Sequence, residues 1–302
     1  MSLTSAIVAL AVGVILPVLL STSLGIVRLA SGGKSEDIVF GVLVLSFAAA
    51  AFGSAIVVTV LLGKRARVAR LQADFTANIS HELRTPLASI RMYAQTLQMG
   101  RLDGDQKRTK ESLEIILRET EWLEAMIDRV LAWRAAAGDR EQPEMKIGSM
   151  RVAVESAVAR FERMVAPGEV DLQASIECET PVLHDADGIG SLVLNLLVNA
   201  YKYSGSDKRI TVTVEDLGDF VEISVKDNGI GIPMDRVGKI FDPFYQIDSG
   251  SSGGTSGAGL GLAIVRHQAR SHSGEVYVES EEGVGSRFSV SLPQVDALKK
   301  DE

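Results

Sequence analysis

The stretch Phe75-Thr-Ala-Asn-Ile-Ser-His81-Glu82-Leu-Arg-Thr85-Pro86-Leu-Ala-Ser-Ile90 places three reactive side chains close together on one helix. Residues four apart lie on the same helical face, so His81 and Thr85 point the same way. Glu82 can hydrogen-bond one nitrogen of the neighbouring His81 ring, which leaves the other nitrogen as a nucleophile. Pro86 removes a backbone donor and should bend the helix just below the histidine. The stretch therefore predicts a helical site suited to phosphoryl chemistry.

Two apolar runs precede this stretch, and both are long enough to cross a bilayer. Leu3 to Leu24 and Ile38 to Leu62 contain no charged residue, and about 20 apolar residues span the hydrocarbon core. The segment from Lys64 to Arg70 is basic, so the positive-inside tendency places it and both termini in the cytoplasm. A cleaved signal peptide is the alternative for residues 1–24, but the basic segment that opens such peptides is missing. We expect a membrane hairpin with a short extracytoplasmic loop.

Composition excludes some classes of protein. The 302 residues carry a net charge of −8, which argues against nucleic-acid binding, because that function favours a basic face. Cys178 is the only cysteine, so no intrachain disulfide can form. We expect Cys178 to be a half-buried residue of a reduced compartment.

The residues after the second apolar run predict two long helices, at Lys64 to Met99 and Asp105 to Ala137, separated by a glycine-containing turn. In the second helix, apolar residues recur at three- and four-residue spacing, namely Leu113, Ile116, Leu117, Leu123, Met126, Ile127 and Val130. Two helices with one apolar stripe each cannot bury both stripes completely. A symmetric dimer that forms a four-helix bundle is the economical solution.

Beyond the polar segment 137–144 the pattern changes to mixed α/β. Helices are expected at 150–165, 186–203 and 260–271, and strands at 171–177, 210–215, 220–225, 275–279 and 287–292. The expected organisation is residues 1–63 for the two membrane helices, 64–137 for a dimerisation and phosphotransfer domain, 138–149 for a linker, 150–293 for a catalytic domain and 294–302 for a polar tail.

The expected helix at 186–203 carries polar side chains on one broad face. These are Asn195, Asn199, Lys202 and Tyr203. Two buried asparagines four residues apart are costly unless they find partners. Neutral amide oxygens suit Mg²⁺ that is shared with phosphates, because hard cations prefer oxygen ligands.

Three later segments carry glycines, an acid and aromatic residues in a fixed order. Asp227, Gly229 and Gly231 follow a strand, where the acid can accept a hydrogen bond from an exocyclic amine and the glycines let a flat ring approach. An aromatic patch with Phe241 and Phe244 comes next. The last segment opens a helix whose N-terminal amides favour phosphate, with Gly257, Gly259 and Gly261. Turn glycines, core phenylalanines and ordinary helix contacts are the alternative interpretation of each segment alone.

Two common nucleotide motifs are absent from the sequence. A dinucleotide fingerprint needs G-x-G-x-x-G after a strand, and position 262 is leucine. No G-x-x-x-x-G-K-[ST] P-loop occurs either. The phosphate site, if the segments form one, is therefore of another type.

The segment His81-Glu82-Leu-Arg-Thr85-Pro86 resembles the phosphoacceptor motif of sensor histidine kinases. The four later segments are similar, in order, to the N, G1, F and G2 boxes of their Bergerat-type ATP-binding domain. The resemblance covers residues 65–293 and implies a fold of three parts: a membrane helical hairpin, an all-α dimerisation hairpin that forms a four-helix bundle in the dimer, and an α+β two-layer sandwich.

The resemblance also implies roles for individual residues. His81 would be the phosphoacceptor, Glu82 the general base, and Thr85 the residue that positions a hydrolytic water. Asn199 would coordinate Mg²⁺. The implied ATP-binding residues are Asn195, Asn199, Lys202, Tyr203, Asp227, Gly229, Gly231, Ile232, Phe241, Phe244, Gly257, Gly259, Leu260, Gly261 and Ser286. Two positions differ from the commonest family pattern, since Gln246 follows the aromatic box and Arg287 precedes Phe288.

The function implied by the resemblance is ATP-dependent autophosphorylation of His81, followed by transfer to an aspartate of a cytoplasmic response regulator. The implied setting is a homodimer in the inner (plasma) membrane, with two spans and a cytoplasmic catalytic part. Because the extracytoplasmic loop is short, the stimulus would be sensed in the membrane or delivered by a membrane sensor partner. The alternatives are a catalytically idle scaffold or co-kinase partner, and another ATPase of the same nucleotide fold.

Overall fold

The computed structural model of the protein describes residues 22–27, 30, 35–102, 104–136, 144–247 and 259–295. The chain divides into two compact units, residues 1–74 and 75–302, and each is described by itself. The first expected apolar run, Leu3 to Leu24, lies almost wholly outside the described residues.

The first unit contains the beginning of helix α3, Ser35–Gln98. Within the described part of the chain, Val39–Val60 is the one helical segment long and apolar enough to cross a membrane. The short helical segment 22–27 approaches α3 closely, because a Cβ on Gly25 would lie 3.0 Å from Leu45 Cγ and 3.3 Å from the Gly41 carbonyl oxygen. Small residues at this contact let the two backbones come together.

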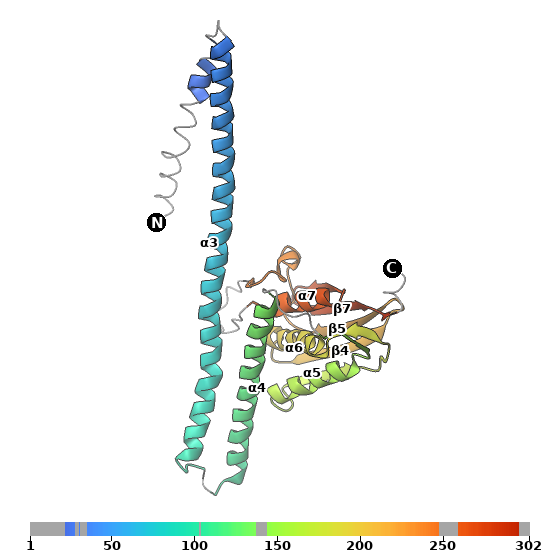
Figure 1. Ribbon diagram of the computed structural model, residues 1–302. Helices are drawn as coiled ribbons and strands as arrows, with labels where there is room; N and C mark the ends of the chain where they lie inside the picture. Colours follow the sequence, from blue (N-terminus) through green and yellow to red (C-terminus); the bar gives the residue numbers. More distant parts are fainter. Residues whose placement is uncertain are drawn as a thin grey trace. The chain divides into compact units, whose positions relative to one another are not determined.

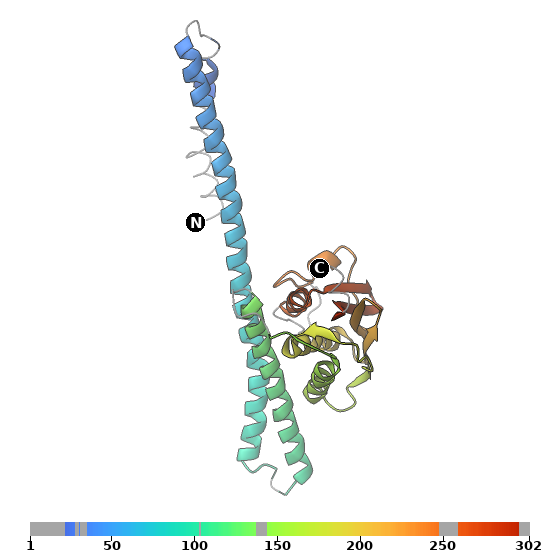
Figure 2. The ribbon, with the colours of Figure 1, turned by 45° about the vertical axis from the view of Figure 1, so that its right-hand side comes forward.

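The second unit begins with a helical hairpin. The C-terminal part of α3 and helix α4, Gln106–Ala136, run antiparallel and side by side (Figures 1 and 2). Gly100 and Gly104 both have positive φ, 64° and 90°, a conformation that glycine adopts without strain. The expected hairpin is confirmed, and α3 continues on both sides of Pro86.

Several apolar side chains on this hairpin remain exposed. They are Leu87, Met92, Leu113, Leu117, Ile127 and Leu131. An exposed stripe of this kind is typical of a surface that another helix covers. The four-helix bundle of a dimer stays a prediction that fits this surface.

The rest of the unit is a two-layer α+β sandwich. Its five-stranded sheet has the order β2-β4-β5-β7-β6, in which β2 and β4 are parallel and the other neighbours antiparallel. Helices α5, α6 and α7 cover one face (Figure 1). The bounds are α5 Arg151–Met164, β2 Val170–Ser175, α6 Ala186–Tyr203, β4 Lys208–Asp216, β5 Phe220–Asp227, α7 Gly261–Ser271, β6 Glu275–Glu281 and β7 Gly285–Pro293. The expected helical hairpin followed by an α+β sandwich is confirmed.

Helix α6 is the central helix of this layer and is buried along most of its length. The Asp185 side chain caps its N-terminus by accepting hydrogen bonds from the amides of Asp187 and Gly188, which satisfies groups that the helix cannot pair internally. Its apolar residues share one core with α5 and the strands. This capped and buried helix fixes the position of the polar residues near its C-terminal end.

Two short strands were not expected from the sequence. β1, Lys146–Gly148, pairs antiparallel with β3, Val182–His184, and β1 falls inside the segment expected to be linker. A three-residue strand carries too little alternation to be detected. The expected polar tail also begins differently, because Gln294 forms a β-bridge with Val182 and its amide donates to the Asp219 carbonyl.

We expect Phe161→Ala to lower the free energy of unfolding by about 3–5 kcal/mol, the usual cost of a cavity left by a buried aromatic ring. Phe161 is fully buried and its ring meets Tyr201 edge-on at 6.1 Å. Val152→Ala on the same helix should cost no more than about 0.5 kcal/mol, because Val152 is 75% exposed. Denaturant unfolding followed by tryptophan fluorescence measures both values, and equal losses would contradict the assigned core.

Candidate nucleotide and phosphoacceptor site

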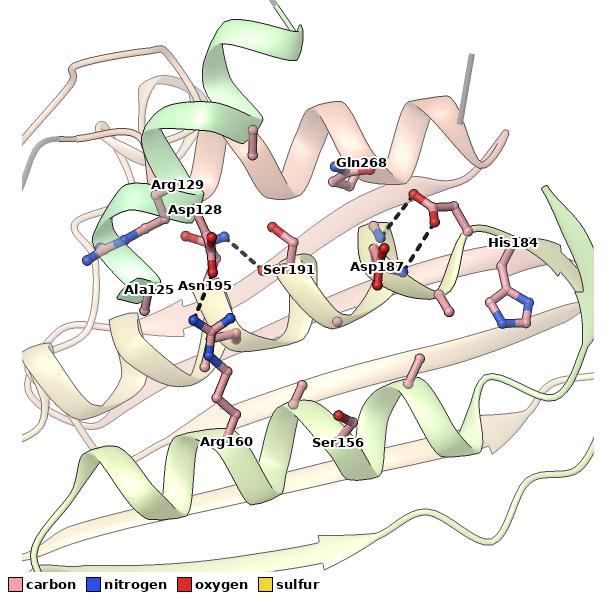
Figure 3. A pocket seen from close by; sticks show the side chains of 18 of the residues that line it. Ala125, Asp128, Arg129, Ser156, Arg160, His184, Asp187, Ser191, Asn195 and Gln268 are labelled. Carbon is pink, nitrogen blue, oxygen red and sulfur yellow. Dashed lines mark hydrogen bonds and ion pairs between the residues drawn. The ribbon is translucent and has the colours of Figure 1, made fainter. Parts of the chain in front are cut away.

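Two asparagines of α6 meet the start of α7. Asn195 is 3% exposed, and its Nδ2 donates to the Ser191 carbonyl at 2.8 Å (Figure 3). Its Oδ1 is buried and has no hydrogen-bond partner among the described residues. A Cβ on Gly261 would lie 3.3 Å from both Asn195 Oδ1 and Asn199 Oδ1. Amide oxygens next to the N-terminal amides of a helix fit a hard cation that is shared with phosphate.

Asp227 ends β5 in a buried position. Its Oδ1 accepts hydrogen bonds from the amides of Gly229, at 2.8 Å, and Ser286, at 3.2 Å. Burial raises the pKa of Asp227, and these two hydrogen bonds partly oppose the rise. Both recorded bonds use the same oxygen, so Oδ2 remains the acceptor available to a ligand.

An apolar cavity of about 90 Å³ lies beside Asp227. Its walls include Ile232, Ile240, Leu262 and Phe288. An apolar slot with one carboxylate at its end is suited to a flat ring that carries an amine.

The glycines around this cavity are required by the fold itself. A Cβ on Gly229 would lie 2.6 Å from the Tyr203 carbonyl oxygen, and one on Gly231 only 2.0 Å from that of Glu281. Gly231 also has a φ of 68°, which side chains rarely adopt. Close backbone packing therefore explains these glycines without a ligand, as in the alternative interpretation from the sequence.

A backbone hydrogen bond joins the aromatic segment to the glycine segment. The Phe244 amide donates to the Gly259 carbonyl at 2.8 Å, and both residues have positive φ, 65° and 67°. The Phe244 ring contacts Trp133 of α4 edge-on at 5.5 Å, whereas Phe241 is buried against Phe288. Segment 248–258, which contains Gly257, lies between these two residues in the chain and is outside the described residues.

Several other residues singled out from the sequence make contacts within the protein itself. The Ser280 hydroxyl accepts from the Ile232 amide at 2.8 Å and pairs with the Ser286 hydroxyl at 2.9 Å. Leu260 is buried and precedes α7. Arg287, one of the two unusual positions, forms an ion pair with Glu222 at 3.0 Å.

Helix α3 contacts α6 of the sandwich through an ion pair. Glu82 Oε1 of α3 lies 3.5 Å from Lys202 Nζ of α6, with side chains 14% and 19% exposed. Burial lowers the pKa of Lys202, and the Glu82 charge opposes this shift. Burial raises the pKa of Tyr203, and Glu82 adds to that shift. The sequence could not reveal this pair, because its members are 120 residues apart.

A cavity of about 70 Å³ surrounds this ion pair. Glu82 from α3, Arg129 from α4, Asn199 and Lys202 from α6, and Gly261 from α7 all line it. His81 precedes Glu82 in α3, and Thr85 is exposed further along the helix. The structure therefore brings the residues next to His81 to the same cavity as the asparagine and glycine segments.

Two of the other histidines are held by hydrogen bonds within the fold. His272 is 4% exposed, its Nε2 accepts from the Asp185 amide at 3.0 Å, and its Nδ1 lies 2.6 Å from the Gln268 carbonyl oxygen. His184, also buried, lies 3.1 Å from the Val182 carbonyl oxygen. His184 ends strand β3, Val182–His184. Burial lowers the pKa of His267.

Two family models match the chain, one after the other along the sequence. Residues 71–135 match the His Kinase A (phospho-acceptor) domain. Residues 184–296 match the histidine kinase-, DNA gyrase B-, and HSP90-like ATPase family. The first matched segment covers most of the α3/α4 hairpin, and the second contains the sandwich from α6 to β7 with its candidate nucleotide cavity but not α5 or β2.

Curated relatives share both regions. The sensor-like histidine kinase SenX3 of Mycolicibacterium smegmatis is 31% identical over 76% of this chain and 60% of its own length. The sensor protein kinase WalK of Staphylococcus saprophyticus is 33% identical over 75% of this chain and 37% of its own length. A solved structure, the mycobacterial sensor histidine kinase MprB, is 27% identical over 50% of this chain and 98% of that chain, with a TM-score of 0.44.

The chain belongs to the sensor histidine kinase family, with a phosphoacceptor domain followed by an ATPase domain of the histidine kinase type. It spans between about one third and three fifths of the length of these two relatives.

Proposed function

We propose that this protein is an ATP-dependent protein-histidine kinase that phosphorylates its own His81. The cavity that Glu82 shares with Asn199, Lys202 and Gly261 carries the proposal. In this cavity Glu82, the neighbour of His81 in the sequence, lies beside the residues suited to phosphate. Phosphoryl transfer depends mainly on positioning and charge neutralisation, and this cavity offers both.

The nucleotide would lie with its base and its phosphates at two neighbouring cavities. Asp227 Oδ2 would accept the adenine amine, while Tyr203 and Ile232 border the ring. The amides of Asn195 and Asn199, the Lys202 ammonium and the backbone from Gly259 to Gly261 would face the phosphates. Asn199 Oδ1 would be the protein ligand of Mg²⁺, with the orphaned Asn195 Oδ1 beside it. The ion supplies neutralisation of phosphate charge when it is bound.

Glu82 has two partners in this proposal. As the carboxylate next to His81, it would take or orient the proton on one ring nitrogen, so that the other nitrogen attacks the γ-phosphorus in line. The same carboxylate holds Lys202 at 3.5 Å. Phosphates that attract Lys202 would loosen this ion pair and free Glu82 for His81.

The wider role proposed for the chain is two-component signalling. A homodimer would cover the exposed apolar stripe of the hairpin, and a cytoplasmic response regulator would receive the phosphoryl group on an aspartate. Two membrane spans in the plasma membrane, of which Val39–Val60 fits one, would hold the catalytic part in the cytoplasm. A membrane sensor partner would supply the stimulus.

Thr85 is proposed to serve the reverse reaction. It lies one helical turn after His81 and is exposed, so its hydroxyl is open to a docked regulator. There it would position the water that removes phosphate from the regulator's aspartate.

The test of the proposed activity is the chemistry of the label. The full chain in detergent, incubated with Mg²⁺ and ATP, should take up label from the γ-phosphate and none from the α-phosphate. The label should be acid-labile and alkali-stable, as a phosphoramidate is. A folded, nucleotide-binding protein that takes up no label would instead favour the scaffold alternative.

A further inference from the structure

Arg129 is a charged residue that the proposed function does not use. It lies on α4 and lines the cavity of Glu82 and Lys202. The Arg129 side chain is only partly exposed, and burial lowers its pKa. Arg129 also lines a larger cavity of about 640 Å³, whose walls include Asp187 and Gln268. In Figure 3 its guanidinium points away from these two residues.

No carboxylate among the described residues lies within ion-pair distance of the Arg129 guanidinium. Its neighbour Asp128 pairs instead with Arg160, at 2.8 Å (Figure 3). Glu82 acts on Arg129 only at longer range and makes its close contact with Lys202. A partly buried cation without a close counter-charge is costly, so a site of this kind is suited to an anion.

The charged residues that line the cavity also favour binding of an anion. Its lining contains two cations, Lys202 and Arg129, and one carboxylate, Glu82; the other lining residues are uncharged. The two cations are close enough for Arg129 to lower the pKa of Lys202. A net positive cavity that also contains Asn199 and Gly261 lies at the phosphate end of the proposed nucleotide site.

We propose that Arg129 binds the terminal phosphoryl group of the bound nucleoside triphosphate and stabilises its charge during transfer to His81. This role deepens the proposed function and rests on it. Arginine suits the task because its planar fork can hold two phosphoryl oxygens at once. The residue comes from the phosphoacceptor hairpin, so its contact forms only when the hairpin and the nucleotide domain are docked. A diphosphate lacks the group that Arg129 would bind.

The first test is a binding measurement that needs no catalysis. In the full chain, Arg129→Gln should weaken binding of a non-hydrolysable ATP analogue, AMP-PNP, about 10-fold, the loss of one charge-assisted contact. Binding of ADP should change less than about 2-fold. Arg134→Gln is the matched control, because Arg134 lies in the last turn of the same helix and is exposed. An unchanged preference for AMP-PNP over ADP, or an equal loss for both nucleotides, would overturn the proposal.

The second test measures transfer. At saturating ATP, Arg129→Gln should slow labelling of His81 about 100-fold, the usual effect of removing one preorganised donor. Arg129→Lys should recover part of the rate, and guanidinium ions should rescue Arg129→Ala, which a merely structural role would not allow. Labelling of Arg129→Gln at the wild-type rate would refute the role in transfer. If the wild-type chain takes up no label, the proposed activity fails, and the AMP-PNP and ADP affinities still decide whether Arg129 binds the terminal phosphoryl group.

Discussion

His81→Gln should remove all acid-labile label from the protein, a loss of at least about 100-fold. Glutamine keeps a polar side chain at this helical position but has no nucleophilic ring nitrogen. Binding of ATP should stay within about 2-fold of wild type, because Asp227, Asn195 and Asn199 lie on the sandwich and are unchanged. The combination of normal binding and absent label separates the loss of a nucleophile from the loss of a folded site.

The matched control for His81→Gln is His267→Gln. His267 lies on α7 and is the other histidine outside the buried pair His184 and His272. This variant should take up label at the wild-type rate. Label that survives in His81→Gln but disappears in His267→Gln would move the phosphoacceptor to α7 and contradict the assignment.

Asp227→Asn should weaken ATP binding about 100-fold. The asparagine Oδ1 can still accept from the amides of Gly229 and Ser286, so the local fold should persist. Its Nδ2, however, would place a donor opposite the donor of the adenine amine, and an unmatched buried polar pair is costly. Titration calorimetry with ATP measures the change, and unaltered affinity would show that Asp227 does not bind the base.

The same variant should stabilise the nucleotide-free protein at neutral pH. The pKa of Asp227 is raised by burial, so its charged form destabilises the folded state above that pKa. Asparagine removes this cost, and the Tm of Asp227→Asn should exceed that of wild type near pH 7. As the pH falls through the raised pKa, the wild-type carboxyl becomes neutral and the difference in Tm should shrink.

Asp216→Asn is the control with the opposite sign. Hydrogen bonds from the Thr180 hydroxyl and the Gly218 amide lower the pKa of the exposed Asp216 carboxyl. A carboxyl with a lowered pKa stabilises the fold above its unfolded pKa, and that stability is lost as the pH falls. Asp216→Asn should therefore lower the Tm at neutral pH and leave ATP binding unchanged. A shift in the same direction for both variants would contradict the electrostatic explanation.

Much of the fold could be predicted from the sequence, because its signals are local. The capped helix that begins at Ala186 and the alternating strands around Phe220 have their expected places. Strands β1 and β3 could not be predicted, since three residues carry no measurable periodicity. Helix α3, Ser35–Gln98, is continuous across Lys64, whereas the sequence predicts separate helices before and after this position.

The candidate site also combines features that the sequence predicts with features that it could not reveal. Polar residues at helical spacing, such as Asn195 and Asn199, predict a shared surface. The sequence could not distinguish glycines that approach a ligand from glycines that approach the protein backbone, as Gly231 does at the Glu281 carbonyl. The contact of Glu82 with Lys202, and the position of Arg129 beside them, depend on docking between segments that are far apart in the chain. Such contacts leave no signal in a single sequence.

In the proposed function, the ion pair between Glu82 and Lys202 would couple the position of helix α3 to nucleotide binding. A stimulus that separates these two residues would then change the affinity for ATP, because it would free the Lys202 ammonium group at the proposed phosphate end of the site. Linkage is reciprocal, so nucleotide binding would shift the equilibrium between the paired and the separated state of these two residues by the same factor. The cellular supply of ATP would then set the sensitivity of the proposed kinase to its stimulus as well as provide the phosphoryl group.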